Sequence, residues 1–285
     1  MPSWLLKAAV QGAISPLPGR DRLNHVLQRY ITGSVTLTDE VFERKLAQCH
    51  RHLESYRTQH GALPRHVLEL GTGWYPIVPI GLIDMGVERV TTFDVNPLCD
   101  LARARTALQR FGSDLRADPA AADAARLLEP LGIRMVVRDV RESGLDQASV
   151  DLFVSNNTLE HIPPATLSEI MAEFRRLAAP GAVMDHFIDM SDHYAHFDRS
   201  ITEFNYLRYS DRRWRLVNNR LQYQNRLRIS DYRRTVEEAG FRVVSEEPER
   251  GHADDLEQIT LAPRFRGYPR DELAILRCWM TAVAV

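Results

Sequence analysis

The sequence predicts an α/β fold in which helices flank a parallel sheet. From residue 67 onward, short runs rich in Val, Ile and Leu alternate with segments of helical period. Such alternation is typical of strand–helix–strand units, whose strands pair in parallel. The first strand runs into a glycine turn and the next two end in aspartates. Ligands bind such sheets at the carboxyl ends of the strands, so one cleft there could hold these groups.

The first predicted strand, Val67 to Leu70, contains Glu69 and ends at the turn Gly71-Thr72-Gly73. Glycine allows the backbone to approach a ligand because no Cβ intervenes, although the same pattern occurs in ordinary turns. The second strand, Val90 to Asp94, lies about 20 residues further on, and its carboxylate can accept hydrogen bonds from ribose hydroxyls. A nicotinamide cofactor would use the same geometry, so these two strands leave the cofactor open.

Two further strands narrow the choice. Met135 to Val140 contains Asp139, and the strand that starts at Val150 is followed by Asn156-Asn157-Thr158-Leu159-Glu160-His161. In this order, the four segments resemble the class I S-adenosylmethionine-dependent methyltransferases over residues 65–190. The chain departs from them at Trp74, where many members have a third glycine, and this aromatic ring could form a wall of the pocket.

The resemblance implies a Rossmann-like, seven-stranded mixed sheet that binds S-adenosylmethionine and releases S-adenosylhomocysteine. It implies that Glu69 fixes the amino end of the methionine, Asp94 holds the ribose, and Asp139 with Val140 flanks the adenine. The implied cofactor residues are Glu69, Gly71, Thr72, Gly73, Asp94, Asn96, Asp139, Val140, Asn156 and Asn157.

Helices are expected before and between the strands. Thr38 is a suitable N-cap, Gly61 a suitable stop, and an apolar stripe from Phe42 to Tyr56 recurs between them. We expect this helix to pack on the sheet or to cover the pocket, and a dimer contact is a further alternative. The other expected helices are 22–32, 77–85, 101–111, 118–131, 166–177 and 231–239. A fifth strand is expected at 182–190, and the last two at 241–246 and 276–284 are implied to form an antiparallel hairpin.

Residues 191–230 interrupt this alternation with about 40 residues in which aromatic and arginine side chains are interleaved. A long segment inside a compact domain is usually functional, and we interpret it as the acceptor-binding region. Aromatic rings stack on sugars, but the same mixture could bind nucleic acid or form a folded subdomain. The expected substrate-binding residues are Tyr194, His196, Tyr206, Arg208 and Tyr209.

Methyl transfer to a hydroxyl needs an aligned acceptor and a proton acceptor, for which histidine is well suited. The expected catalytic residues are His161, His186 and Asp189, with His161 favoured as general base because the resemblance places it facing the methyl group. Backbone hydrogen bonding and substrate orientation are the alternatives for His161. Any metal ion, such as Mg²⁺, would be held by Asp185, Asp189 and His193.

A looser resemblance concerns acceptor choice. Residues 192–198, 205–209 and 223–227 resemble bacterial glycan methyltransferases, such as those that O-methylate mannose polysaccharides. It implies O-methylation of a sugar or oligosaccharide. A small natural-product or phenolic acceptor, an RNA methyltransferase and a non-catalytic subunit are the alternatives.

Composition limits the other classes. The net charge of −2 provides no basic field for nucleic acid or membrane surfaces, and the longest apolar runs are too short for a membrane span. Three widely spaced cysteines predict no disulfide framework, which suits the cytoplasm. The expected parts are an N-terminal helical segment (1–64), a cofactor-binding core (65–190), the insertion (191–230) and the end of the core (231–285), with a homodimer left open.

Overall fold

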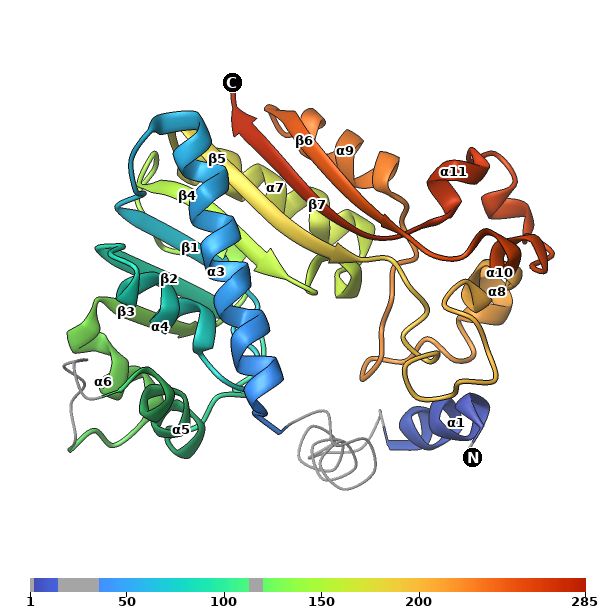
Figure 1. Cartoon of the computed structure of the whole chain (residues 1–285), viewed down its shortest axis with the longest axis horizontal. Coiled ribbons are helices and arrows are strands. Elements are labelled where there is room, and N and C mark those ends of the chain that lie inside the picture. Colours follow the sequence, from blue (N-terminus) through green and yellow to red (C-terminus); the bar gives the residue numbers. More distant parts are fainter. Residues whose placement is uncertain (1–2, 15–35, 113–119) are drawn as a thin grey trace.

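The computed structural model describes residues 3–14, 36–112 and 120–285. Within these ranges, seven strands form one sheet in the order β3-β2-β1-β4-β5-β7-β6 (Figure 1). Strands β1 to β5 are parallel, whereas β7 is antiparallel to both of its neighbours, which confirms the expected mixed sheet. The strands are β1 (His66–Leu70), β2 (Arg89–Asp94), β3 (Ile133–Val137), β4 (Val150–Asn156), β5 (Ala178–Asp189), β6 (Phe241–Arg250) and β7 (Ile275–Ala284).

Most predicted helices are present with small shifts at their ends. The helices are α1 (Trp4–Ile14), α3 (Asp39–His60), α4 (Ile77–Asp84), α5 (Leu101–Phe111), α6 (Ala124–Leu128), α7 (Pro164–Leu177), α8 (Asp211–Trp214), α9 (Ile229–Glu238), α10 (Ala253–Glu257) and α11 (Arg270–Leu273). The helix expected at 118–131 begins later because Asp123 caps it by accepting a hydrogen bond from the Arg126 N–H. The helix expected at 22–32 lies outside the described residues.

Helix α3 has the predicted ends. The Thr38 side chain accepts a hydrogen bond from the Val41 N–H, and Gly61 ends the helix in a left-handed conformation with a φ of 65°. Phe42, Cys49 and Leu53 are buried against the face of the sheet that also carries α4 and α5. Packing on the sheet is therefore one role of this helix.

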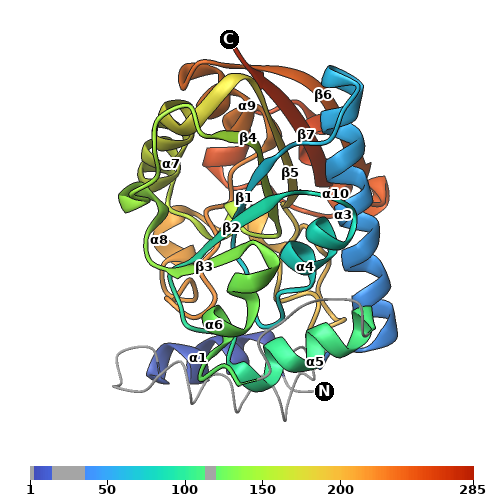
Figure 2. The ribbon, with the colours of Figure 1, turned by 90° about the vertical axis from the view of Figure 1, so that its left-hand side faces the viewer.

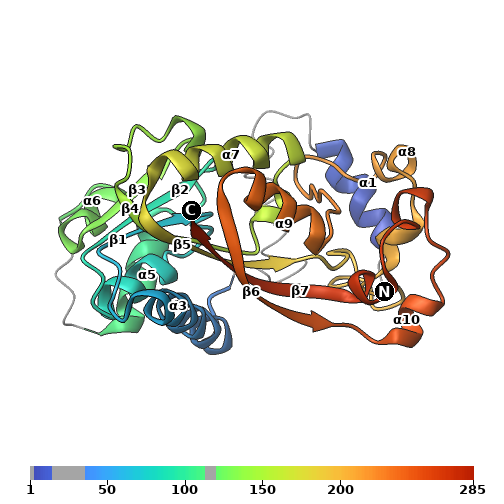
Figure 3. The same ribbon diagram turned by 90° about the horizontal axis from the view of Figure 1, so that it is seen from above.

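Two hydrophobic clusters sandwich the sheet. One lies beneath α7 and α9 and includes Phe153 and Phe174, and the other lies beneath α3, α4 and α5. Figure 2, seen from the β3 edge, shows α7 and α3 on opposite sides of the strands, and Figure 3 shows the same separation from above. The core thus has three layers. Because β1 to β5 are parallel and adjacent, their carboxyl ends lie at one edge of it.

A third hydrophobic cluster lies beyond the end of β5. It joins α1, the 191–228 segment and the connection between β6 and β7, which the sequence analysis assigned to three different parts (Figure 1). Its buried members include Trp4, Tyr194, Phe204, Tyr206, Leu207, Trp214, Leu256, Phe265, Leu273 and Leu276. We call this assembly the distal subdomain.

Two arginines of the insertion are internal to the distal subdomain. Arg228 is wholly buried and donates to the carbonyl oxygens of Met190 and Leu273, at 3.0 and 3.3 Å. Arg226 is 4% exposed and donates to the Tyr209 carbonyl at 2.6 Å. These guanidinium groups hold the subdomain together and are not presented to a phosphate or an acceptor.

Within the described ranges, no helix combines the length and the apolar character that crossing a bilayer requires.

Candidate active site

The turn after β1 has the conformation that the glycine pattern predicts. Gly71 and Gly73 have φ angles of 89° and 68°, which favour glycine. A Cβ at Gly71 would collide with the Thr158 side chain, whereas a Cβ at Gly73 would meet no atom within 4 Å. The backbone at Gly73 therefore faces open space, as close approach of a ligand requires.

Asp94 ties this turn to the end of β2. Its carboxylate accepts hydrogen bonds from the backbone N–H groups of Gly73 at 3.0 Å and Asn96 at 2.9 Å. Burial raises the pKa of Asp94, although these two hydrogen bonds act in the opposite direction. The structure thus brings Gly73, Asp94 and Asn96 together. Asp94, the residue expected to bind the ribose, also holds the glycine turn in place.

Two apolar side chains beside Asp94 were missed by the sequence analysis. Val95 is 66% exposed and Val137 is 55% exposed, and Val137 pairs with Asp94 across β2 and β3. Large apolar residues exposed at the end of parallel strands are suited to cover a flat ring. Val140, which was expected to flank the adenine, is instead buried in the core because a short helical turn follows β3.

The Asp139 carboxylate is engaged by neighbouring protein groups. It caps the turn that contains Val140 and forms an ion pair with Arg141, at 2.6 Å. The Arg141 guanidinium lowers the pKa of Asp139. Arg141 also bonds to Glu169 of α7, so this carboxylate is part of a surface ion-pair network in this structure.

Glu69 is buried and points toward α3. Its carboxylate accepts a hydrogen bond from the Thr92 hydroxyl at 2.7 Å, and Thr92 is in turn bonded to the Thr72 hydroxyl. Burial raises the pKa of Glu69 to about 7, while Thr92 and the charge of Lys45 oppose this rise. A carboxyl with this pKa can change its charge in response to a bound cationic group.

A buried hydrogen-bonded chain fixes Asn156 at the end of β4. Nδ1 of His52 lies 2.6 Å from the Asp185 carboxylate, and Nε2 of the same ring lies 3.1 Å from Nδ2 of Asn156. Ser55 and Thr281 donate to the other oxygen of Asp185. Asp185 therefore orients His52, which accepts from the Asn156 amide, so that the amide can rotate little.

One acceptor atom of Asn156 takes no part in these hydrogen bonds. Oδ1 of Asn156 is buried and has no hydrogen-bond partner among the described residues. A buried polar atom without a partner is costly, so this oxygen is suited to accept a hydrogen bond from a ligand. Asn157 is exposed and has a φ of 54°, which turns the chain sharply after the strand.

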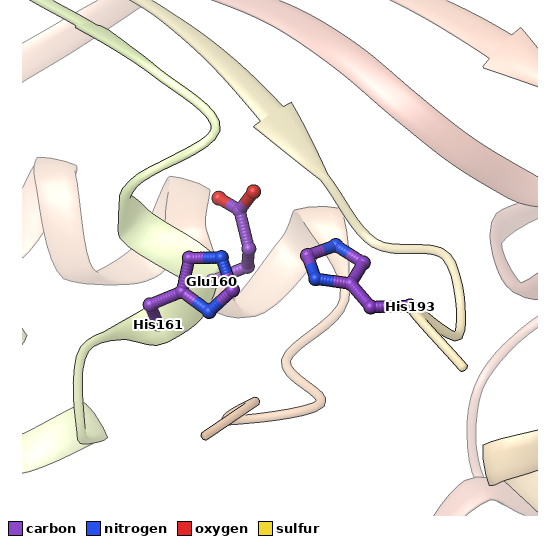
Figure 4. Close-up of side chains that lie close together, drawn as sticks. All are labelled: Glu160, His161 and His193. Atoms are coloured by element: carbon purple, nitrogen blue, oxygen red, sulfur yellow. The ribbon is translucent and has the colours of Figure 1, made fainter. Parts of the chain in front are cut away.

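The loop after β4 and the loop after β5 bring three ionisable side chains together. One potential ligand atom from each of Glu160, His161 and His193 lies within 4.8 Å of the others. We call these residues the Glu-His-His cluster (Figure 4). His161 and His193 were expected site residues, whereas Glu160 was not, although the adjacent Glu-His pair is visible in the sequence.

The three groups of this cluster differ in their ionisation. Burial raises the pKa of Glu160 well above its usual range, and the nearby charge of Asp189 adds to this effect. Burial lowers the pKa of His193 to about 3. His161 is exposed as a residue, yet desolvation of its ring lowers its pKa as well, so both rings are neutral near pH 7.

The other expected catalytic residues lie at different depths. His186 is 1% exposed, its Nδ1 is 2.8 Å from the Ser155 hydroxyl, and its ring stacks near Phe174, so it is part of the core. Burial lowers the pKa of His186 to about 4. Asp189 lies beside the cluster, with Oδ2 at 3.7 Å from Nε2 of His193. The structure thus groups Asp189 with His161 and leaves His186 apart.

The expected acceptor-binding residues also divide into buried and accessible ones. Tyr194 and Tyr206 are 0% and 1% exposed and pack inside the distal subdomain, so they do not form an open binding surface. Their alternation with arginines reflects a hydrophobic core, a distinction that the sequence pattern alone could not make. His196 is partly exposed and stacks near His193 with ring centroids 5.4 Å apart, and Arg208 is exposed. Tyr209 is half-buried and lies against Trp4 of α1.

The expected metal ligands are not gathered as a set. Asp185 is occupied by His52, Ser55 and Thr281 on the α3 side of the sheet. Asp189 and His193 lie together at the carboxyl end of β5. A large surface depression of about 1130 Å³ lies at the opposite edge of the sheet, lined by Arg65, Glu88 and Arg134, and contains none of the expected site residues.

Part of the chain matches a known protein family. Residues 68–184 match the family model of a methyltransferase domain, which spans β1 to the middle of β5. The protein is an S-adenosylmethionine-dependent methyltransferase. No curated protein sequence matches the chain.

Solved structures show the same fold as this methyltransferase. The PH0226 protein from Pyrococcus horikoshii OT3 is 13% identical, with a TM-score of 0.53, and the match covers 90% of this chain and 97% of that one. A structure from Listeria monocytogenes, assigned to the S-adenosylmethionine-dependent methyltransferases, is 15% identical with a TM-score of 0.50, covering 85% and 98%. The carbon methyltransferase CurJ is 14% identical with a TM-score of 0.50, covering 92% and 58%. Identities this low establish a shared fold alone.

The cofactor of the methyltransferase is S-adenosylmethionine, which supplies a methyl group on a sulfonium. The residues at the strand ends fit this cofactor. The turn at Gly73 has open space beside it, Asp94 is held at the end of β2, and Oδ1 of Asn156 is an acceptor without a hydrogen-bond partner among the described residues.

Proposed function

We propose that this methyltransferase O-methylates a hydroxyl of a sugar or short oligosaccharide. The observation that supports the proposal is the Glu-His-His cluster. Its residues lie in the loops that follow β4 and β5. Its imidazole and carboxyl groups, together with Asp189 and the exposed His196, offer hydrogen bonds to an acceptor that carries several hydroxyl groups.

His161 is the proposed general base. Its Nδ1 lies 2.7 Å from the Tyr223 carbonyl oxygen, an acceptor that requires a proton on Nδ1. The lone pair is therefore on Nε2, and the lowered pKa keeps the ring neutral near pH 7. A neutral imidazole held in one tautomer can accept the proton of an acceptor hydroxyl.

The roles proposed for the cofactor residues follow from their positions. Asp94 would bind the ribose, the exposed Val95 and Val137 would cover the adenine, and the turn at Gly71 and Gly73 would pass close to the methionine. Glu69 lies behind this turn and would act on the amino group through its charge.

The test is transfer of labelled methyl from S-adenosylmethionine to separate pools of sugars, oligosaccharides, phenols and RNA. We expect label in a sugar or oligosaccharide, and a loss of about 100-fold or more in His161→Gln, as is typical for a general base. His50→Gln is the matched control, because His50 is an exposed imidazole on α3. Label confined to phenols or RNA would refute the sugar acceptor, and an equally active His161→Gln would refute the base.

A small hydroxylated natural product is the second candidate acceptor. The same cluster could bind a phenol or a vicinal diol, and the phenol pool distinguishes the two candidates. An RNA acceptor receives less support, because Arg226 and Arg228 are buried within the distal subdomain.

A further inference from the structure

The Glu-His-His cluster is assembled from two loops that converge from different strands. Glu160 and His161 belong to the short turn Leu159–His161 after β4, and His193 follows β5. Figure 4 shows the Glu160 carboxylate and both imidazole rings directed toward the same small region. The ring centroids of His161 and His193 are 5.0 Å apart.

The carboxyl group of this cluster is buried without a partner. Glu160 is 2% exposed, and neither of its carboxyl oxygens has a hydrogen bond of ordinary geometry within the described ranges. The backbone N–H groups of Glu160 and Asp189 and the amide of Asn157 partly oppose the rise of its pKa that burial causes. A buried carboxyl group without a hydrogen-bond partner is costly, so Glu160 is suited to bind a ligand.

The His161 ring is oriented as a metal-ligating histidine usually is, and Nε2 of His193 is unpartnered. A ligating histidine commonly donates its second N–H to a carbonyl or carboxylate, which fixes the ring. Nδ1 of His161 donates to the Tyr223 carbonyl, which leaves Nε2 available. Nε2 of His193 is buried, has no hydrogen-bond partner among the described residues and lies 3.7 Å from the Asp189 carboxylate.

The loop that carries these ligands is clamped from the distal subdomain. The Asn225 backbone N–H donates to the Glu160 carbonyl at 2.9 Å, and its side-chain amide donates to the carbonyls of Leu159 and Ile162, at 2.9 and 3.0 Å. Asn225 itself is buried. The ligand positions are therefore preorganised, which lowers the entropic cost of binding an ion.

We propose that Glu160, His161 and His193 bind a divalent transition-metal cation. Two nitrogen donors and one carboxylate suit Zn²⁺, Mn²⁺, Fe²⁺ or Co²⁺, whereas Mg²⁺ and Ca²⁺ prefer sites made of oxygen donors. Three protein ligands leave coordination positions for an acceptor. This ligand set differs from the Asp185, Asp189 and His193 set expected from the sequence, and shares only His193 with it.

The role of the ion rests on the proposed O-methylation. A coordinated hydroxyl is more acidic than a free one, so the cation would activate the acceptor by lowering the pKa of its hydroxyl. Nε2 of His161 cannot bind the cation and a proton at once. In a metal-loaded enzyme, His161 would therefore hold the ion and would not act as the base. The proton of the coordinated hydroxyl would pass to the Asp189 carboxylate, which lies beside the cluster.

The test is metal binding by the whole chain, without substrate. Protein freed of metal with a chelator is titrated with Co²⁺, and bound ion is followed by visible absorption and elemental analysis. We expect a single Co²⁺ per chain in the wild type and in His50→Gln. Glu160→Gln and His193→Gln should weaken binding by about 100-fold or more, because even loss of an outer partner of a ligand costs about 10- to 100-fold.

Circular dichroism and S-adenosylmethionine binding in chelator show whether each variant is folded. If one variant unfolds, the other decides. Absence of bound Co²⁺ in the wild type, or equal binding in the wild type and both folded variants, would overturn the metal site. Failure of the two proposals is separable: sugar methylation that persists in chelator without Co²⁺ binding removes only the metal, whereas Glu160-dependent Co²⁺ binding without labelled sugar removes only the acceptor.

Discussion

The ionisation of Glu69 leads to a quantitative prediction for Glu69→Gln. The Glu69 pKa is about 7 in the folded protein, against an ordinary value of 4.5. Between these values the folded state binds more protons than the unfolded state, so the free energy of unfolding falls as pH rises. From pH 5 to pH 8 this loss is about 2.5 kcal/mol, since each unit of pKa difference corresponds to about 1.4 kcal/mol.

Glutamine preserves the shape of Glu69 and an acceptor for the Thr92 hydroxyl, but it does not titrate. Urea unfolding of both proteins at pH 5 and pH 8 therefore reports the contribution of Glu69, because groups that do not feel its charge titrate alike in the two proteins. We expect the stability of Glu69→Gln relative to the wild type to rise by about 2.5 kcal/mol between these pH values. A relative stability that stays constant or falls would refute the reasoning.

Ionisation of Glu69 should also affect the cofactor. If the carboxylate acts on the amino group of S-adenosylmethionine, binding to the wild type strengthens as pH rises through about 7, and binding to Glu69→Gln shows no such rise. Calorimetric titration at several pH values measures both curves. Parallel curves for the two proteins would exclude this role of Glu69.

Three further predictions concern the strand ends and the chain behind them. Gly71→Ala should weaken S-adenosylmethionine binding at least tenfold and lower the Tm, because the φ of 89° at Gly71 and the nearby Thr158 side chain both oppose a Cβ. Calorimetry and thermal unfolding measure these changes, and an unchanged Kd would contradict the prediction. Asp94→Ala should raise the Kd about 10- to 100-fold, since the carboxylate holds the turn through two hydrogen bonds to a charged group; a Kd within twofold of the wild type would show that the turn holds itself. His52→Leu should lower the free energy of unfolding by about 2–3 kcal/mol, because the Asn156 amide and the buried Asp185 carboxylate lose their partner. Urea unfolding measures this change, and an unchanged stability would show that these hydrogen bonds contribute little.

The fold was predictable because its signals are local. A strand that ends at Gly71, a carboxylate at the end of the next strand and the caps at Thr38 and Gly61 each depend on neighbouring residues. The same is true of the alternation that sets the parallel sheet. The start of the helix at Ala124 was missed because a capping aspartate within an alanine-rich run is a weak signal.

The candidate site was less predictable because it depends on contacts between distant segments. His193 reaches Glu160 only because β5 lies beside β4 in the sheet. The sequence also does not reveal how deeply a side chain is buried, so Tyr194 and Tyr206 resembled binding residues although they form a core. For the same reason the adenine-facing role was assigned to Val140, whereas Val137 is the exposed valine.

The makeup of the distal subdomain constrains how the chain acquires its structure during synthesis. The backbone N–H of Trp4 donates to Asp198, 194 positions later in the chain. At about 5–20 residues per second, a ribosome needs roughly 10–40 s to add that many residues. The members of the same hydrophobic cluster in the 253–274 region are synthesised later still. The buried side chains of α1 therefore lack their partners while most of the sheet is synthesised. The distal subdomain, which contributes His193, can be completed only after the 253–274 region has been added.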